Sequence, residues 1–182
     1  MRRRVRTTRL LVSLVIAGMV LAACGEDGDT ASPDIEGVVV EDGQTNDHVA
    51  DPTYDTDPPS GGDHDQVWLN CDFYEIEVPD KHAVHSLEHG VVWFAHDPDL
   101  PEDEINALRA LYDSRSDRVI VSPYDGLDAA VVAVAWERRL EVDSAEDPRL
   151  EEFLDAFVNG AQAPEPSAVC TGGAGQRRSA TD

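Results

Sequence analysis

Hydrophobic residues recur along this chain with two spacings, one typical of strands and one typical of amphipathic helices. Residues 73–78 alternate between apolar and polar side chains, which predicts a strand. Continuous apolar runs predict three further strands over residues 91–96, 118–122 and 129–136. Apolar residues three and four positions apart predict helices over residues 99–115 and 147–158.

The predicted order is β, β, α, β, β, α. It indicates an α+β fold in which two helices pack on one face of a small, mostly antiparallel sheet. A long irregular N-terminal segment precedes the first of these elements, because Pro52, Pro58-Pro59 and the Ser60-Gly61-Gly62 turn disfavour regular structure.

The first residues have the form of a secretory signal. Five arginines between residues 2 and 9 precede an apolar run over residues 10–23, which is shorter than the ~20 residues that span a bilayer. Small residues lead to Cys24, as in the bacterial lipobox, where cleavage leaves a lipid-carrying cysteine at the new N-terminus. We therefore expect an extracytoplasmic protein anchored to the cell membrane by lipid on Cys24. The alternative is an ordinary signal peptide that ends in cysteine.

Charge narrows the choice of partners. Removal of residues 1–23 takes away five of the 14 basic residues and none of the 37 acidic ones, so the mature chain carries a formal charge of −28. Such a surface disfavours nucleic acid, so we expect no nucleic-acid partner. We expect the acidic stretch before Lys81 to be a solvated surface. The alternative is that this stretch weakly attracts cations.

Composition sets the expected boundaries. Residues 1–23 form the signal peptide, and the polar, acidic residues 24–47 are expected to be a disordered tether. Residues 48–170 are expected to form one α+β domain, followed by a disordered tail over residues 171–182. Cys71 and Cys170 are the only other cysteines, and in an oxidising compartment such a pair usually forms a disulfide. Two free thiols or a role in metal binding are the alternatives.

The segment His85-Ser86-Leu87-Glu88-His89, followed by Gly90 and an apolar run, carries the clearest chemical signal. Imidazoles four positions apart on one helical turn can chelate a divalent metal. Because Gly90 and the strand follow at once, we expect a short chelating turn at the mouth of the domain. We expect Glu88 to be an orienting group as much as a ligand.

Several blocks together resemble a known family. They are His48-Val49, Tyr54, Pro58-Pro59, Ser60-Gly61, His64, Cys71, Tyr74, Val84-His85-Ser86-Leu87-Glu88-His89-Gly90-Val91-Val92-Trp93, Ser122-Pro123-Tyr124, Ala135-Trp136 and Ala163-Pro164-Glu165-Pro166. In these the chain is similar to the bacterial domain-of-unknown-function family 3105. The resemblance implies a secreted, lipid-anchored or membrane-tethered protein, and it implies no particular activity. The chain departs from the family pattern at Glu137, where a glycine is expected, and in the loop over residues 60–63.

Four of the six histidines, His48, His64, His85 and His89, fall in these blocks, whereas His82 and His96 do not. His64 follows a flexible turn that can fold its ring toward the pair. We therefore expect a metal site made of the ligands His64, His85, His89, Glu88 and His48. Imidazole-rich sites without sulfur suit Zn or Cu. The alternative is that these histidines only hydrogen-bond the backbone and pack the loop.

Two classes of function stay open, and no catalytic residue is assigned in either. The first is a metal-binding lipoprotein. The second is a structural or interaction lipoprotein without metal, whose protein partner is unknown and whose contact residues would be Trp68, Tyr74 and Tyr124. His85-Ser86-Leu87-Glu88-His89 also matches the inverted zinc-peptidase pattern. Those enzymes place it in a long helix, which Gly90 prevents, so hydrolysis is the least favoured reading.

Overall fold

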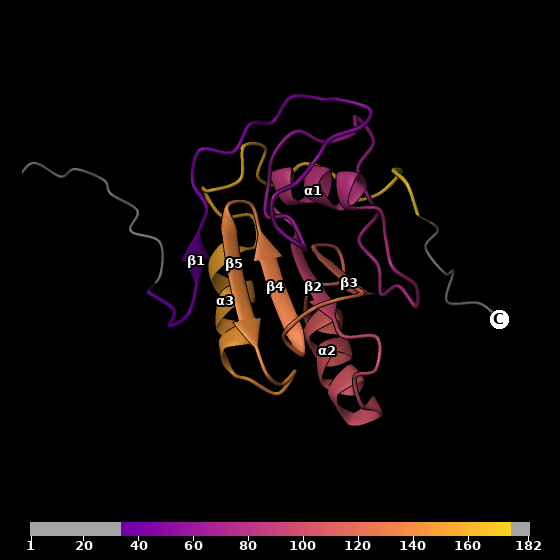
Figure 1. Cartoon of the computed structure of the whole chain (residues 1–182), viewed down its shortest axis with the longest axis vertical. Helices are drawn as coiled ribbons and strands as arrows, with labels where there is room; N and C mark the ends of the chain where they lie inside the picture. The colour runs from indigo at the N-terminus through magenta and orange to yellow at the C-terminus, as the bar shows by residue number, and fades with distance from the viewer. Residues whose placement is uncertain (1–33, 176–182) are drawn as a thin grey trace, which may run out of the picture. The chain divides into compact units, whose positions relative to one another are not determined.

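A computed structural model describes residues 34–175, which form one five-stranded sheet and three helices. The strands lie side by side in the order β1-β5-β4-β2-β3, from left to right in Figure 1. Only β2 and β3 are parallel, and the other neighbours are antiparallel. The expected α+β class with a mostly antiparallel sheet is therefore confirmed.

The elements are short. The strands are β1 (Val39–Val40), β2 (Val92–His96), β3 (Val119–Pro123), β4 (Val131–Ala135) and β5 (Arg138–Val142). The helices are α1 (Asp80–Glu88), α2 (Glu102–Ser114) and α3 (Arg149–Phe157). No helix among residues 34–175 is long and apolar enough to cross a bilayer.

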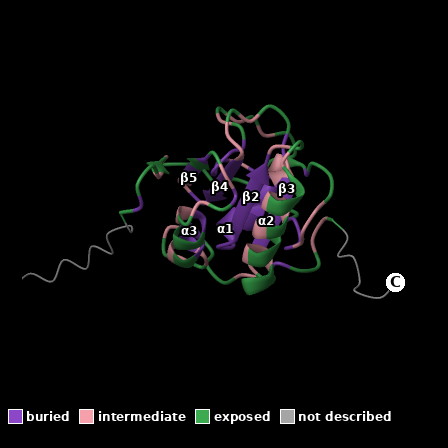
Figure 2. Cartoon of the chain, turned by 90° about the horizontal axis from the view of Figure 1, so that it is seen from below, coloured by how far each residue is buried: buried purple, intermediate pink, exposed green. Residues whose placement is uncertain are grey.

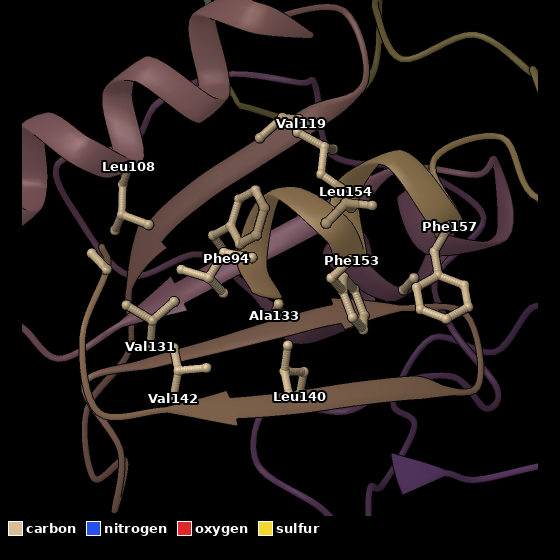
Figure 3. Packing of buried hydrophobic residues seen from close by; sticks show 14 of the residues in the cluster. Phe94, Leu108, Val119, Val131, Ala133, Leu140, Val142, Phe153, Leu154 and Phe157 are labelled. Atoms are coloured by element: carbon tan, nitrogen blue, oxygen red, sulfur yellow. The ribbon is translucent and has the colours of Figure 1, made fainter. Parts of the chain in front are cut away.

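Helices α2 and α3 cover one face of the sheet, as the helical spacing predicted. Every second residue of the strands points toward them, among them Phe94 of β2 and Leu140 of β5. Phe153 and Phe157 of α3 stack edge to face at 4.7 Å between ring centres above these strands, and Figure 3 shows Phe153 and Leu154 pointing into this core. Burial of such large apolar side chains supplies most of the stability of a fold of this size, roughly 2 kcal/mol for each.

The opposite face of the sheet is covered by α1 and by irregular segments. Trp93 of β2 and Ile120 of β3 point to this side, where they meet Val84 and Leu87 of α1. Since both faces are covered, all five residues of β2 and all five of β4 are buried, as the purple strands in Figure 2 show, whereas the outer sides of α2 and α3 are exposed. The continuous apolar runs in the sequence reflect this double burial.

Two predictions at this face were wrong. Residues 73–78 form no strand of the sheet: Phe73 makes a single bridge to Val121, and Ile76 of the alternating segment is 72% exposed. The alternation was misleading because only Val78 of this segment is buried, whereas Phe73 is half-buried and residues 75–77 are exposed. The residues after Pro79, expected to form only a turn, instead form helix α1.

The folded part also begins before residue 48, where we placed its start. Within the segment expected to be a tether, Ile35 is buried in the α2/α3 core, and β1 pairs with Arg138 and Arg139 of β5. Figure 1 shows the segment after β1 passing over the same end of the sheet as α1. The expected signal peptide, Cys24 and residues 176–182 lie outside the described residues.

A two-residue connection joins β4 to β5, and Glu137 in it has a φ of +58°. This left-handed conformation is strained for any residue with a side chain, which explains why glycine is expected here. The glutamate makes contacts that a glycine lacks. Its Oε1 accepts hydrogen bonds from the backbone N–H groups of Gly43 at 2.7 Å and Gln44 at 2.8 Å. The turn thereby fastens the N-terminal segment to the sheet.

Candidate metal centre

Helix α1 ends in a turn that brings three functional side chains together. Its stop signal is a Schellman motif: the N–H of Gly90 donates to the carbonyl of Leu87 at 2.9 Å, and that of Val91 to Ser86 at 3.1 Å. Gly90 has a φ of +83°, and a side chain there would collide with the backbone of Asn159. The last helical turn carries His85 and Glu88, and His89 caps it.

The N-terminal segment supplies the other two histidines. His48 and His64 form a short parallel bridge, in which the N–H of His64 donates to Asp47 at 3.0 Å and that of Val49 to His64 at 2.8 Å. The ring of His48 stacks on that of His85, with centres 4.9 Å apart and planes 21° apart. The segment therefore lies directly against the end of α1.

The ligand atoms of His48, His64, His85 and Glu88 all lie within 4.8 Å of one another. His64 is fully buried, and His85 and Glu88 are 4% exposed, whereas His48 is exposed. Two ligands of one ion with bonds of 2.0–2.1 Å are at most about 4.2 Å apart. The four ligand atoms are therefore within about 0.6 Å of the separations that one shared ion allows.

Backbone carbonyls fix the orientation of three of the rings. A carbonyl oxygen can only accept a hydrogen bond, so each Nδ1 that meets one carries the proton. The Nε2 atom of each neutral ring then presents its lone pair to the interior of the site, which is how ligating histidines are usually prepared. The pairs are His64 Nδ1 with Gly62 O at 2.9 Å, His85 Nδ1 with Asp65 O at 2.7 Å and His89 Nδ1 with Val169 O at 2.7 Å.

His85 and His89 face each other with these free atoms. Their Nε2 atoms are 3.1 Å apart. If both rings are neutral, two lone pairs meet at this distance and repel, so the arrangement calls for a cation beside them. Nitrogen ligands of one tetrahedral zinc ion are about 3.3 Å apart, which is close to the observed separation.

His64 and Glu88 form a buried pair. Glu88 Oε2 is 3.0 Å from His64 Nε2, and Glu88 Oε1 accepts a hydrogen bond from the Asn46 side chain at 2.9 Å. Burial opposes the charge on each partner, but the hydrogen bonds outweigh it. They raise the pKa of His64 above its usual range and lower the pKa of Glu88 below its own. A proton on His64 Nε2 thus occupies the place where a metal would bind.

His85 behaves in the opposite way. Burial lowers its pKa to about 4, and the proximity of His89 and His64 adds to this effect. His85 is therefore neutral at physiological pH, with a lone pair on Nε2 beside the His64–Glu88 pair, since Nε2 lies 4.0 Å from Glu88 Oε2. Neutral imidazoles and one carboxylate are the ligands that Zn²⁺ and Cu²⁺ prefer, so the residues present fit such an ion.

The expected site residues are brought together with one difference. His48, His64, His85 and Glu88 form the compact group, while His89 lies at its edge and contacts His85. The motif that we expected to be a short turn is the C-terminal turn of α1. His82 and His96 lie elsewhere, with their Nδ1 atoms at the carbonyls of Val67 and Asp97.

The predicted disulfide between Cys71 and Cys170 is present, with Cα atoms 5.4 Å apart. It ties the C-terminal segment to the loop before α1. The residue before Cys170 is Val169, whose carbonyl orients His89, so the bridge also supports the edge of the site.

Three contributors to the site were missed in the sequence. Asn46 binds Glu88, but no motif marks it. Trp68 packs against His85 and His89, with ring centres 5.8 and 5.4 Å away. Glu165 lies 3.8 Å from His89 Nε2, and it belongs to the Ala163–Pro166 block of the family pattern, which was the signal that could have found it.

Comparison with known protein families agrees with the family resemblance seen in the sequence. Searches of curated proteins and of solved structures returned no match. A family described as "Protein of unknown function (DUF3105)" matches residues 47–172, which include every residue of the site except Asn46. Because the match spans more than half of the chain, this protein belongs to the DUF3105 family.

Proposed function

We propose that this protein is a lipid-anchored extracytoplasmic domain that binds one divalent ion, Zn²⁺ or Cu²⁺. His64, His85 and Glu88 hold the ion, and His48 closes the site from the solvent side. The observation that carries the proposal is the set of backbone carbonyls that hold the imidazoles of His64 and His85 with their Nε2 atoms toward the same carboxylate. Such fixed orientation lowers the cost of ordering the ligands when the metal binds.

Binding is favoured over peptide hydrolysis. In the inverted zinc-peptidase pattern the glutamate must be free to activate water, but here one oxygen of Glu88 contacts His64 and the other contacts Asn46. Helix α1 has nine residues, and His89 lies at its cap rather than inside a long helix. These contacts support a role for Glu88 as a ligand or orienting group.

A second function has one observation in its favour. Without metal, the His64–Glu88 hydrogen bond already satisfies both side chains. A structural lipoprotein that uses this buried pair only to fasten its N-terminal segment to α1 would have the same contacts. The separation of 3.1 Å between the Nε2 atoms of His85 and His89 favours the metal-binding alternative, because it is close to that of two nitrogen ligands of one ion.

Elemental analysis of the untagged protein after zinc or copper repletion tests the metal. We expect about one equivalent per chain, and loss of that ion in the double variant His64→Ala/His85→Ala. The matched control is His82→Ala/His96→Ala, which removes two histidines outside the site and should leave the stoichiometry unchanged. Absence of bound metal in the repleted wild type would leave the structural lipoprotein as the function.

The anchor rests on the N-terminal sequence and has its own test. Cys24→Ser removes the proposed lipid attachment point, so we expect the variant in the soluble fraction and the wild type in the membrane fraction. A variant that stays with the membrane would contradict the anchor without affecting the metal proposal.

A further inference from the structure

We propose that the metal centre contains two overlapping ligand sets that share His85, so that an ion passes between a buried and an exposed position by ligand exchange. The inference rests on the proposed metal-binding function. The inner set is His48, His64, His85 and Glu88. The outer set is His85, His89 and Glu165.

The cluster holds more donors than one small ion uses. Tetrahedral sites take four ligands, whereas six metal-binding side chains lie in one connected series here. Within the inner set, His64 Nε2 and Glu88 Oε2 are 3.0 Å apart, and His85 Nε2 lies 4.0 Å from the same oxygen. These three side chains are 0–6% exposed, so the inner set is the buried end of the series.

The outer set continues from His85 toward the solvent. His85 Nε2 is 3.1 Å from His89 Nε2, which in turn is 3.8 Å from Glu165 Oε2. The side chain of His89 is 5% exposed, but that of Glu165 is 62% exposed. The backbone N–H of Glu165 donates to the carbonyl of Glu88 at 3.0 Å, which holds this carboxylate beside the end of α1.

His85 decides how the two sets are used. Its Nδ1 carries the proton donated to Asp65 O, so Nε2 is its one metal-binding atom, and one lone pair binds one ion at a time. The two sets therefore exclude each other. An ion that keeps its bond to His85 can exchange His48, His64 and Glu88 for His89, Glu165 and water without leaving the protein, and its charge does not change. The vacated His64–Glu88 pair takes up one proton from solvent. This arrangement suits delivery of the ion to an acceptor rather than permanent storage.

The rate of zinc release tests the inference on the full chain in detergent micelles. Zinc-loaded protein is mixed with the chromophoric chelator 4-(2-pyridylazo)resorcinol, and the dissociation constant is measured separately by competition. Glu165→Gln removes the exposed carboxylate but retains the backbone contact. We expect it to slow zinc loading and release by the same factor, about fivefold for the loss of one exposed charge interaction, with the dissociation constant unchanged.

The control variant is Glu152→Gln, which changes an exposed glutamate of α3 on the opposite side of the sheet. It should leave both rates unchanged. If zinc binds tightly but leaves wild type and Glu165→Gln at the same rate, the outer set is overturned and the proposed metal-binding function stands. A second result would also overturn the outer set: His48→Ala accelerates zinc release, and Glu165→Gln leaves the release rate unchanged. The ion would then leave through the hollow of about 250 Å³ at His48. A wild type that holds no zinc would overturn the proposed function itself.

Discussion

Replacement of Glu88 by glutamine separates the two tasks of this carboxylate, which are to pair with protonated His64 and to bind the metal. The substitution keeps the size of the side chain and one oxygen but removes the charge. In the metal-free protein Glu88 lowers the free energy of the imidazolium form of His64 through the hydrogen bond of 3.0 Å. In the metal-bound protein that proton is absent and the carboxylate contacts the ion instead.

The size of each effect follows from the burial of the pair. A hydrogen bond to a charged group contributes about 1.5–3 kcal/mol. At 4 Å and an effective dielectric constant of 20, a divalent ion and a unit charge attract each other by ~8 kcal/mol, and the desolvation of both cancels most of this. We therefore expect Glu88→Gln to weaken zinc binding by about 2–3 kcal/mol, or roughly 30- to 150-fold.

The protonation of His64 and of Glu88 determines how stability and metal affinity change with pH. The pKa of His64 is raised, so its contribution to stability is full below the ordinary value of 6.5 and is lost as pH rises through the raised value. The pKa of Glu88 is lowered, so its contribution is full above 4.5 and is lost as pH falls through the lowered value. The metal-free pair thus stabilises most between these two ordinary values, whereas metal affinity rises at higher pH because the proton on His64 must leave.

Isothermal titration calorimetry in two buffers of different ionisation enthalpy counts the protons released on zinc binding. At pH 6.5 we expect the wild type to release more than half a proton per zinc, because the pKa of His64 is raised above this pH. Glu88→Gln should release distinctly fewer, because without the carboxylate burial lowers the pKa of His64. Glu152→Gln should release as many protons as the wild type. Equal proton release by wild type and Glu88→Gln would refute the assignment of the proton to the His64–Glu88 pair.

Three further substitutions test the fold around the site. Glu137→Gly relieves a strained backbone by about 1 kcal/mol but loses two charge-assisted hydrogen bonds of about 1–2 kcal/mol each, so urea denaturation should show a net loss of about 1–3 kcal/mol; a gain would contradict this balance. Burial and the nearby carboxylates raise the pKa of Asp80 to about 6 despite its hydrogen bond from Tyr124. Its charge therefore costs stability as pH rises from the ordinary value of 3.8 to about 6, and Asp80→Asn should be more stable than wild type by about 1–2 kcal/mol at pH 7.5, with little difference at pH 4. Cys71→Ser/Cys170→Ser opens a loop of 99 residues, for which chain entropy predicts a loss of about 4–5 kcal/mol in denaturation experiments; an unchanged denaturation midpoint would contradict it.

Long, regular hydrophobic patterns predicted the fold where burial is regular. The apolar runs of β2 and β4 and the helical stripes of α2 and α3 were recognised, because each element packs on the sheet along its whole length. Helix α1 was missed because three of the six residues that it buries, His85, Ser86 and Glu88, are polar, so the segment shows no apolar stripe of helical length. Pro79 before it and Gly90 after it were the available boundary signals.

Strand β5 was missed for a related reason. Leu140 and Val142 alternate toward the core, but Arg138, Arg139 and Glu141 between and before them gave the segment the appearance of a loop. Strand β1 has two exposed residues, and it exists because β5 offers it a free edge. Long-range pairing of this kind leaves no local pattern in the sequence.

The candidate site was predicted more fully than its surroundings. His85, Glu88 and His89 are close in sequence, so any helical turn brings them together. The approach of His48 and His64 depends on their bridge. The family resemblance supported both residues, and the flexible turn before His64 supported that residue alone. Asn46 and the carbonyls that orient the imidazoles could not be predicted, because backbone groups and single amides carry no motif.

The most direct test of the central claim is anomalous diffraction from crystals of the zinc-loaded protein, recorded on both sides of the zinc absorption edge. The account predicts one zinc peak within about 2.1 Å of the Nε2 atoms of both His64 and His85, with a Glu88 oxygen next to it. A zinc peak that shares neither imidazole, or a fully repleted protein whose His64 and Glu88 remain hydrogen-bonded with no zinc beside them, would contradict it.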